Sequence, residues 1–196
     1  MRKNLSSLSR GFILLCLGYS LSFGVTPTKM GFNVGLVGPE NLNVTVGGGG
    51  LMDFGFDLGA SGSIHVQPTI EFWYSSEHYS HGNPLSSYYY TWKYSVFELS
   101  INALGRYYFP VPSTLPIQPF AGTGFAFCMD FSDVDNTYAG ISPSGSTDSH
   151  NGFCLTGGMD FNIGRHKAFV EIREKIGDFN VFKLLFGMMF PFGGSR

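Results

Sequence analysis

A strict alternation of side-chain character in residues 182–192 is the feature that most constrains the fold. One parity carries only large apolar side chains: Phe182, Leu184, Phe186, Met188, Phe190 and Phe192. Because successive side chains of a β-strand point to opposite faces, this pattern predicts a strand with one wholly apolar face. An apolar face of this length that ends in aromatic residues suits contact with lipid.

Seven upstream segments repeat this alternation of an apolar parity with a polar or small one. The expected strands cover residues 29–37, 42–58, 64–74, 91–109, 117–131, 152–163 and 168–175. Because Pro68 cannot donate a ladder hydrogen bond, we expect a bulge or a gap in pairing there. We predict an all-β fold, an eight-stranded antiparallel up-and-down transmembrane β-barrel, whose last strand pairs with the first and removes the sheet edges.

Composition and side-chain volume separate a membrane barrel from a soluble one. Charged residues make up 13% of the chain, against ~25% in typical soluble domains. No uninterrupted apolar run reaches the ~20 residues of a spanning helix. A soluble barrel would have to pack the apolar parity of all eight strands inside, where an eight-stranded barrel has room for few large side chains. The apolar parity is therefore expected to face lipid.

The N-terminus predicts export. Arg2, Lys3 and Arg10 precede an apolar segment at 11–19, and residues 20–24 supply the small side chains of a cleavage site. The alternative, a short membrane anchor, is disfavoured because the apolar segment is brief and no stop-transfer pattern follows. We predict a signal peptide at 1–24 and a barrel domain at 25–196. Its removal leaves nine basic and 14 acidic residues, a formal charge of −5, which excludes nucleic-acid binding.

Charged residues on the inward parity are expected to neutralise one another. An unpaired ion away from water costs several kcal/mol. We predict an interior charge ladder with Glu71, Glu98, Glu171 and Arg173 at its centre. Its members are Asp53, Glu71, Glu98, Arg106, Asp160, Glu171, Arg173 and Lys183. A proton or ion path is the functional alternative.

Two cysteines remain after residue 24. Cys128 and Cys154 lie on the inward parity of consecutive strands, equidistant from a hairpin centre expected near residue 141. This placement and the exported context favour a disulfide. The alternative is two packed thiols.

A search for catalytic or metal-binding residues gives two weak patterns. Glu77, His78 and His81 have a metal-like spacing, but no second cluster completes a four-ligand site, which favours a solvated loop. Ser75 or Ser76 beside His78 is the nearest candidate for a nucleophile and base, but a third, orienting group is missing. We therefore expect no catalytic residue, no metal site and no cofactor.

The whole pattern resembles the small eight-stranded outer-membrane barrels, the opacity-protein and OmpA/OmpX-like group, over residues 25–196. The most specific match is the C-terminal run with Gly187, Phe190 and Phe192, which resembles the signal read by the barrel-assembly machinery. The chain departs from the group in its tail at 193–196 and in Leu185, where the signal often has a polar residue. The resemblance implies the bacterial outer membrane, with its lipid and the assembly machinery as partners.

These observations predict a non-enzymatic outer-membrane barrel that displays loops. The polar connections at 76–90 and 132–151 are expected on the outer side, where they could meet an extracellular ligand. Two alternatives stay open: a porin-like barrel that transports small solutes, and a lipid-A-modifying enzyme.

Overall fold

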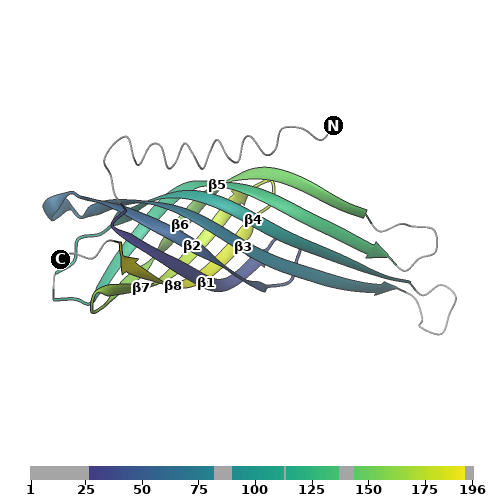
Figure 1. Cartoon of the computed structure of the whole chain (residues 1–196), viewed down its shortest axis with the longest axis horizontal. Helices are drawn as coiled ribbons and strands as arrows, with labels where there is room; N and C mark the ends of the chain where they lie inside the picture. Colours follow the sequence, from purple (N-terminus) through teal and green to yellow (C-terminus); the bar gives the residue numbers. More distant parts are fainter. Residues whose placement is uncertain (1–26, 82–89, 113, 137–143, 193–196) are drawn as a thin grey trace.

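The computed structural model describes residues 27–81, 90–112, 114–136 and 144–192. Residues 1–24, the expected signal peptide, lie outside these ranges. No helix within the described ranges is long and apolar enough to cross a membrane. The strands are β1 (Lys29–Pro39), β2 (Thr45–Asp57), β3 (Ser63–His81), β4 (Tyr90–Tyr108), β5 (Ile117–Asn136), β6 (Ser144–Ile163), β7 (His166–Gly177) and β8 (Val181–Pro191), with a 3₁₀ turn at Gly59–Ser61 (Figure 1).

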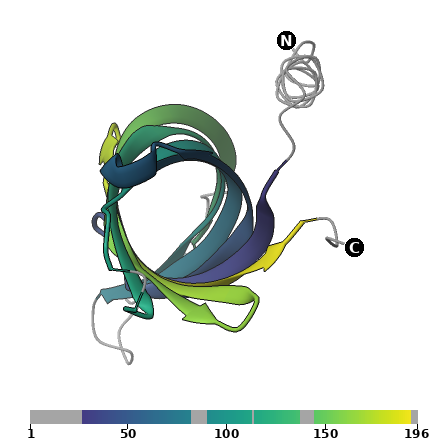
Figure 2. The same cartoon turned by 90° about the vertical axis from the view of Figure 1, so that its left-hand side faces the viewer.

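The strands form one closed antiparallel barrel in sequence order, which confirms the predicted fold (Figure 2). The closing contact runs along β1 and β8, from Met30 opposite Phe190 to Leu36 opposite Leu184. Pairing between β2 and β3 is interrupted between Leu51 opposite Thr69 and Phe54 opposite Val66. Pro68 lies in this gap, as its missing N–H requires.

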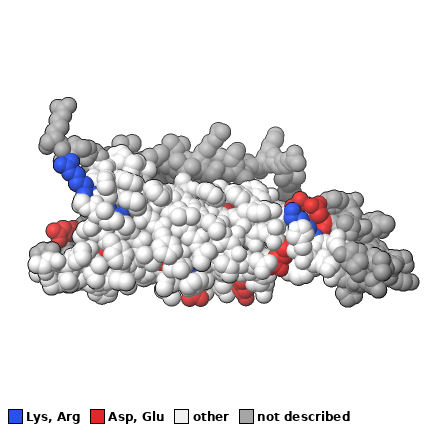
Figure 3. Space-filling model, turned by 90° about the horizontal axis from the view of Figure 1, so that it is seen from below, with Lys and Arg blue, Asp and Glu red and all other residues white. Residues whose placement is uncertain are grey.

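The outer face is apolar, as predicted. Half of the side-chain surface of Phe32, Phe72 and Ile172 is exposed, at 50%, 53% and 52%. In the view of Figure 3, the face of the wall is mostly uncharged; charged groups lie near its two ends and a few acidic ones along its lower edge. A continuous apolar wall of this kind suits contact with lipid.

Strand length differs around the barrel and corrects the predicted loops. β3, β4, β5 and β6 have 19 or 20 residues, whereas the other four strands have 11 to 13. The predicted loops at 76–90 and 132–151 were too long, because 76–81, 132–136 and 144–151 belong to strands. The apolar alternation ends where contact with lipid ends, but backbone pairing continues beyond it. Residues 82–89 and 137–143 lie outside the described ranges.

The lumen is filled by side chains of both kinds. Five carboxylates and four cations are buried there, among polar neighbours. Apolar side chains lie between these charged groups, whereas the sequence pattern predicts a lumen of polar and small side chains. One apolar group comprises Val37, Trp73, Val96 and Val181; another comprises Leu51, Phe169 and Met189.

Candidate functional site

The middle of the lumen holds a continuous network of ion pairs. Glu71 accepts hydrogen bonds from Arg173 Nη1 at 2.6 Å, from Lys183 Nζ at 2.8 Å and from Asn33 Nδ2 at 3.2 Å. Gly49 lies opposite Glu71, and a Cβ there would come within 2.7 Å of Glu71 Cγ. The run of glycines in β2 therefore makes room for this side chain.

Glu171 extends the network to a second arginine. It accepts hydrogen bonds from Arg173 Nε at 2.8 Å and Thr156 Oγ1 at 2.6 Å, and it pairs with Arg106. Both carboxylates of the network are thus bound to two cations each. Carboxylates that are enclosed and bound to two cations each suit a structural role better than proton transfer.

The eight residues predicted for the ladder divide into separate groups. All eight are buried. Five form the central network: Glu71, Arg106, Glu171, Arg173 and Lys183. Asp160 pairs with Lys167 at 3.5 Å, while Glu98 and Asp53 belong to clusters of their own.

Glu98 lies at the centre of a cluster nearer the outer end. It accepts hydrogen bonds from Trp73 Nε1 at 2.9 Å and Lys175 Nζ at 2.7 Å. Lys175 Nζ also lies 3.3 Å from Cys128 Sγ and 2.9 Å from His150 Nε2. Glu98, Cys128 and His150 are close enough together to hold a metal ion. The Lys175 ammonium already contacts all three, so the cluster carries its own cation.

The predicted disulfide between Cys128 and Cys154 is wrong in this structure. Both are free and buried. The hairpin register places Cys128 opposite His150 and Cys154 opposite Gly124. The two cysteines are therefore four positions apart, roughly 13 Å along the strands at 3.3 Å per residue. A disulfide requires Cα atoms within about 7 Å.

A third cluster, at the mouth of the barrel beside the 59–62 turn and opposite to the long hairpins, joins Asp53, His65 and Ser63. Ser63 and His65 are two positions apart on one face of β3, and Asp53 lies on β2. His65 Nδ1 lies 2.9 Å from both carboxylate oxygens of Asp53, and His65 Nε2 lies 3.1 Å from Ser63 Oγ. Because Gly55 pairs with His65, the imidazole can lie over the β2 backbone; a Cβ at Gly55 would be 2.8 Å from the ring.

Neighbouring side chains hold the carboxylate of this cluster in place. Gln67 Nε2 donates to Asp53 Oδ1 at 2.6 Å, and Thr28 Oγ1 donates to Oδ2 at 3.1 Å. The ring of Tyr108 packs against His65, with 4.4 Å between ring centroids. Asp53 is buried, whereas His65 and Ser63 are half-buried.

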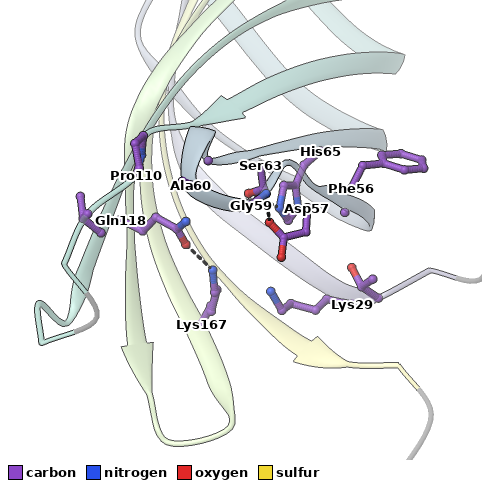
Figure 4. A pocket seen from close by; sticks show the side chains of 14 residues that line it. Lys29, Phe56, Asp57, Gly59, Ala60, Ser63, His65, Pro110, Gln118 and Lys167 are labelled. Atoms are coloured by element: carbon purple, nitrogen blue, oxygen red, sulfur yellow. Dashed lines mark hydrogen bonds between the residues drawn. The ribbon is translucent and has the colours of Figure 1, made fainter.

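Ser63 and His65 line an open pocket of about 670 Å³. Figure 4 shows Lys29 and Lys167 reaching into this pocket from two different strands. Lys167 Nζ donates to Gln118 Oε1 at 2.9 Å. Within the described ranges, no carboxylate lies within ion-pair distance of Lys29. The pocket therefore places a serine–histidine pair beside two lysines; Asp57 lines it as well, and Lys167 pairs with Asp160 at 3.5 Å.

The other residues singled out in the sequence do not form a site. Glu77 and His78 lie on β3 rather than in a loop, and Ser75 Oγ donates to the Asn43 carbonyl at 3.3 Å. Tyr79 is exposed and donates to the Glu77 carboxylate, which raises the pKa of Tyr79. The side chain of His81 is outside the described part.

The residues of the predicted assembly signal lie at the closing seam. Phe190 packs against Phe32 across the β1–β8 contact, with 6.1 Å between centroids. Gly187 is covered by the ring of Phe169, where a Cβ would be 2.3 Å from the ring. This packing gives Gly187 a structural role besides the predicted one. Phe192 follows β8 and is exposed.

Lys175, His150 and the Ser63–His65 pair are the site residues that sequence reasoning missed. Lys175 lies on the inward parity of a recognised strand, so its parity could have identified it. Ser63 and His65 also share a parity with Asp53 once β2 and β3 are paired. That pairing depends on the register, which the turn at 59–62 sets.

The fold is similar to that of solved structures. Neisserial surface protein A (NspA) is 14% identical, covers 84% of this chain and 96% of its own, and has a TM-score of 0.50. The chain has the fold of the small outer-membrane barrels.

Two further structures are similar. Ail, the attachment invasion locus protein of Yersinia pestis, is 11% identical over 85% of this chain and 100% of its own, with a TM-score of 0.48. The outer membrane enzyme PagL is 14% identical over 84% and 99%, with a TM-score of 0.46. No protein-family model matches the chain, and no curated protein matches it.

Proposed function

We propose that the lumen and the outer hairpins of the barrel form a non-enzymatic scaffold, which closes the lumen and holds two hairpins above the outer membrane. The observation that carries this proposal is the extension of the β3–β4 and β5–β6 hairpins beyond the other strands. An extracellular partner of these hairpins and recognition of the C-terminal strand by the assembly machinery belong to the same proposal.

The lengths of the hairpins support display. The β3–β4 ladder continues for six residue pairs from Ser76 opposite Ser95 to His81 opposite Tyr90, above the last pairs of β2. At 3.3 Å per residue this extension is about 20 Å. The β5–β6 ladder continues for eight pairs, about 26 Å, beyond Gly152 opposite Gly177.

The hairpins differ in chemistry. The β5–β6 hairpin carries several acidic side chains: Asp130, Asp133, Asp135 and Asp148. On the β3–β4 hairpin Tyr79 stacks on Trp92, with 4.5 Å between centroids. An acidic surface beside an exposed aromatic pair suits a partner that offers basic groups.

Surface labelling tests the display. Asp133→Cys places a thiol on the β5–β6 hairpin, and Ala60→Cys places one at the opposite end; both positions are exposed. In a background without the native cysteines, a membrane-impermeant maleimide should label Asp133→Cys on intact cells. Ala60→Cys should be labelled only after the cells are broken. Equal labelling on intact cells would contradict the proposed orientation.

Conductance separates this scaffold from a transport barrel. The largest fully buried side chains include Trp73, Arg106, Arg173 and Tyr108, which fill the lumen and leave little space for solutes. Folded protein in planar bilayers should give no stepwise conductance, while an open porin added afterwards should conduct. Regular conductance steps from the pure protein would favour transport.

A further inference from the structure

We propose that Ser63, His65 and Asp53 form a hydrolytic site at the mouth beside the 59–62 turn, which cleaves acyl esters that carry a negative charge. This activity goes beyond the scaffold role proposed for the lumen and the hairpins. It rests on a serine–histidine–carboxylate chain that opens into a pocket lined by two lysines.

The three groups have the order and spacing that nucleophilic catalysis requires. A carboxylate can only accept, so the hydrogen bond at His65 Nδ1 places a proton on that nitrogen. His65 Nε2 is then the acceptor for the Ser63 hydroxyl at 3.1 Å. A nucleophile and base in hydrogen-bond contact, with a third group that orients the base, is the recurring arrangement of serine hydrolases.

The surroundings fix this arrangement. Gln67 and Thr28 hold Asp53, Tyr108 supports one face of the imidazole, and the absent Cβ of Gly55 leaves space for the ring. Exposure increases from Asp53 to His65 and Ser63. The orienting group is thus enclosed, and the nucleophile faces the pocket.

The pocket indicates the class of substrate. Lys29 and Lys167 line it together with Ser63, and Asp57 lines it too (Figure 4). Lys167 is paired with Asp160 at 3.5 Å, whereas no carboxylate among the described side chains lies within ion-pair distance of Lys29, so Lys29 is the cation that attracts an anionic ester. Pro110 and Val111 supply an apolar surface for a short acyl chain.

The reaction follows from these positions. Ser63 Oγ attacks the ester carbonyl carbon while His65 Nε2 takes the hydroxyl proton. The carbon–oxygen bond to the alcohol breaks, and His65 returns the proton to the departing oxygen. Water, deprotonated by His65, then attacks the acyl-Ser63 ester, and the acid leaves with Ser63 restored. One ester and one water give one acid and one alcohol.

Covalent labelling tests the nucleophile. A fluorophosphonate probe added to the folded barrel in detergent should modify Ser63, with the adduct located by peptide mass spectrometry. Labelling should be lost in Ser63→Ala and His65→Gln and kept in Ser61→Ala, a matched serine on the neighbouring 3₁₀ turn. The heat-dependent gel mobility of each variant reports that it is folded. Absent labelling of wild type, or labelling that survives Ser63→Ala, would overturn the proposal.

Kinetics test the positioning role of Asp53. With 4-nitrophenyl acetate as substrate, Asp53→Asn should lower kcat by roughly 10²-fold or more and leave KM unchanged, since the residue acts through His65. A change in KM alone would contradict this role.

A matched pair of esters tests the substrate class. Wild type should hydrolyse 4-acetoxybenzoate faster than phenyl acetate at low salt. The preference should disappear in the double variant Lys29→Gln/Lys167→Gln, while fluorophosphonate labelling of Ser63 persists. An equal rate for the two esters in wild type would refute the anionic preference. These readouts do not depend on conductance or on hairpin display, so this proposal and the scaffold proposal fail separately.

Discussion

The central network and the mouth beside the 59–62 turn both contain buried carboxylates, but these have different kinds of partner. In the central network, Glu71 and Glu171 each bind two cations, and all these side chains are buried. At the mouth, Asp53 has an imidazole and two neutral donors as partners. The first arrangement locks charge in place. The second leaves a base that can exchange a proton.

This difference indicates how to distinguish buried carboxylates that take part in chemistry from those that only stabilise the barrel. Permanent cations such as arginine cannot release a proton near neutral pH, whereas histidine can. Burial and ion pairing alone are therefore poor guides to function in a narrow barrel. The decisive features are the type of partner and access to a pocket.

The largest expected effect concerns the central network. Arg173→Met removes the cation shared by Glu71 and Glu171 and should lower the free energy of unfolding by about 3–5 kcal/mol. Urea unfolding of the barrel in lipid vesicles, followed by gel mobility, measures the change. Esterase activity of the fraction that remains folded should stay within about twofold, because additivity holds for separate sites.

A matched control is Glu174→Gln, on the same strand but with an exposed side chain. Its effect on unfolding should stay within about 1 kcal/mol. If Arg173→Met costs no more than this control, the network does not stabilise the barrel.

The next effect concerns the mouth alone. In Gly55→Ala, the new methyl group should displace the His65 ring and lower kcat by about 10²-fold, since a misplaced base loses its geometry. The free energy of unfolding should change by less than about 1 kcal/mol. Steady-state hydrolysis of 4-nitrophenyl acetate measures kcat, and urea unfolding measures the free energy of unfolding. An unchanged kcat would mean that the ring position is irrelevant to the activity.

A smaller effect is expected at Glu98. Trp73→Phe keeps most of the ring volume but removes the N–H that donates to Glu98, which should cost about 1–3 kcal/mol in unfolding free energy. Trp92→Phe, on the protruding hairpin, is the control and should stay within about 0.5 kcal/mol. Equal effects of the two substitutions would show that the hydrogen bond from Trp73 to Glu98 does not contribute to stability.

The smallest effect is expected for the cysteines. Since Cys128 and Cys154 are free, reductant should leave the urea midpoint of the chain without residues 1–24 unchanged. Alkylation after unfolding without reductant should add two labels per chain, counted by intact mass. A mass without added labels would indicate a disulfide.

The period-two pattern was sufficient to predict the architecture. It gave eight strands, the apolar outer face and the pairing of residues 182–192 with the first strand. The pattern worked because lipid requires one apolar face on each strand over its whole membrane depth. It could not predict that β3 extends to His81 and that β6 begins at Ser144, since polar residues exposed to water occur both in strands and in loops.

Contacts inside the lumen were harder to predict, because they depend on register as well as parity. A hairpin centred at 139 rather than near 141 separates Cys128 from Cys154 and brings His150 opposite Cys128. The register of β2 and β3 likewise brings His65 to Asp53. A serine two positions from a histidine on one strand is common, and only the paired carboxylate distinguishes this pair.

The unequal strand lengths give the outer rim a slope. The wall is low along β7, β8, β1 and β2 and high along β3 to β6 (Figure 1). A partner that bound the inner flank of the tall hairpins, as proposed above, would rest over the low rim, next to the lipid head groups. Its approach would be oblique and it would contact both protein and membrane, so lipid composition would affect its affinity.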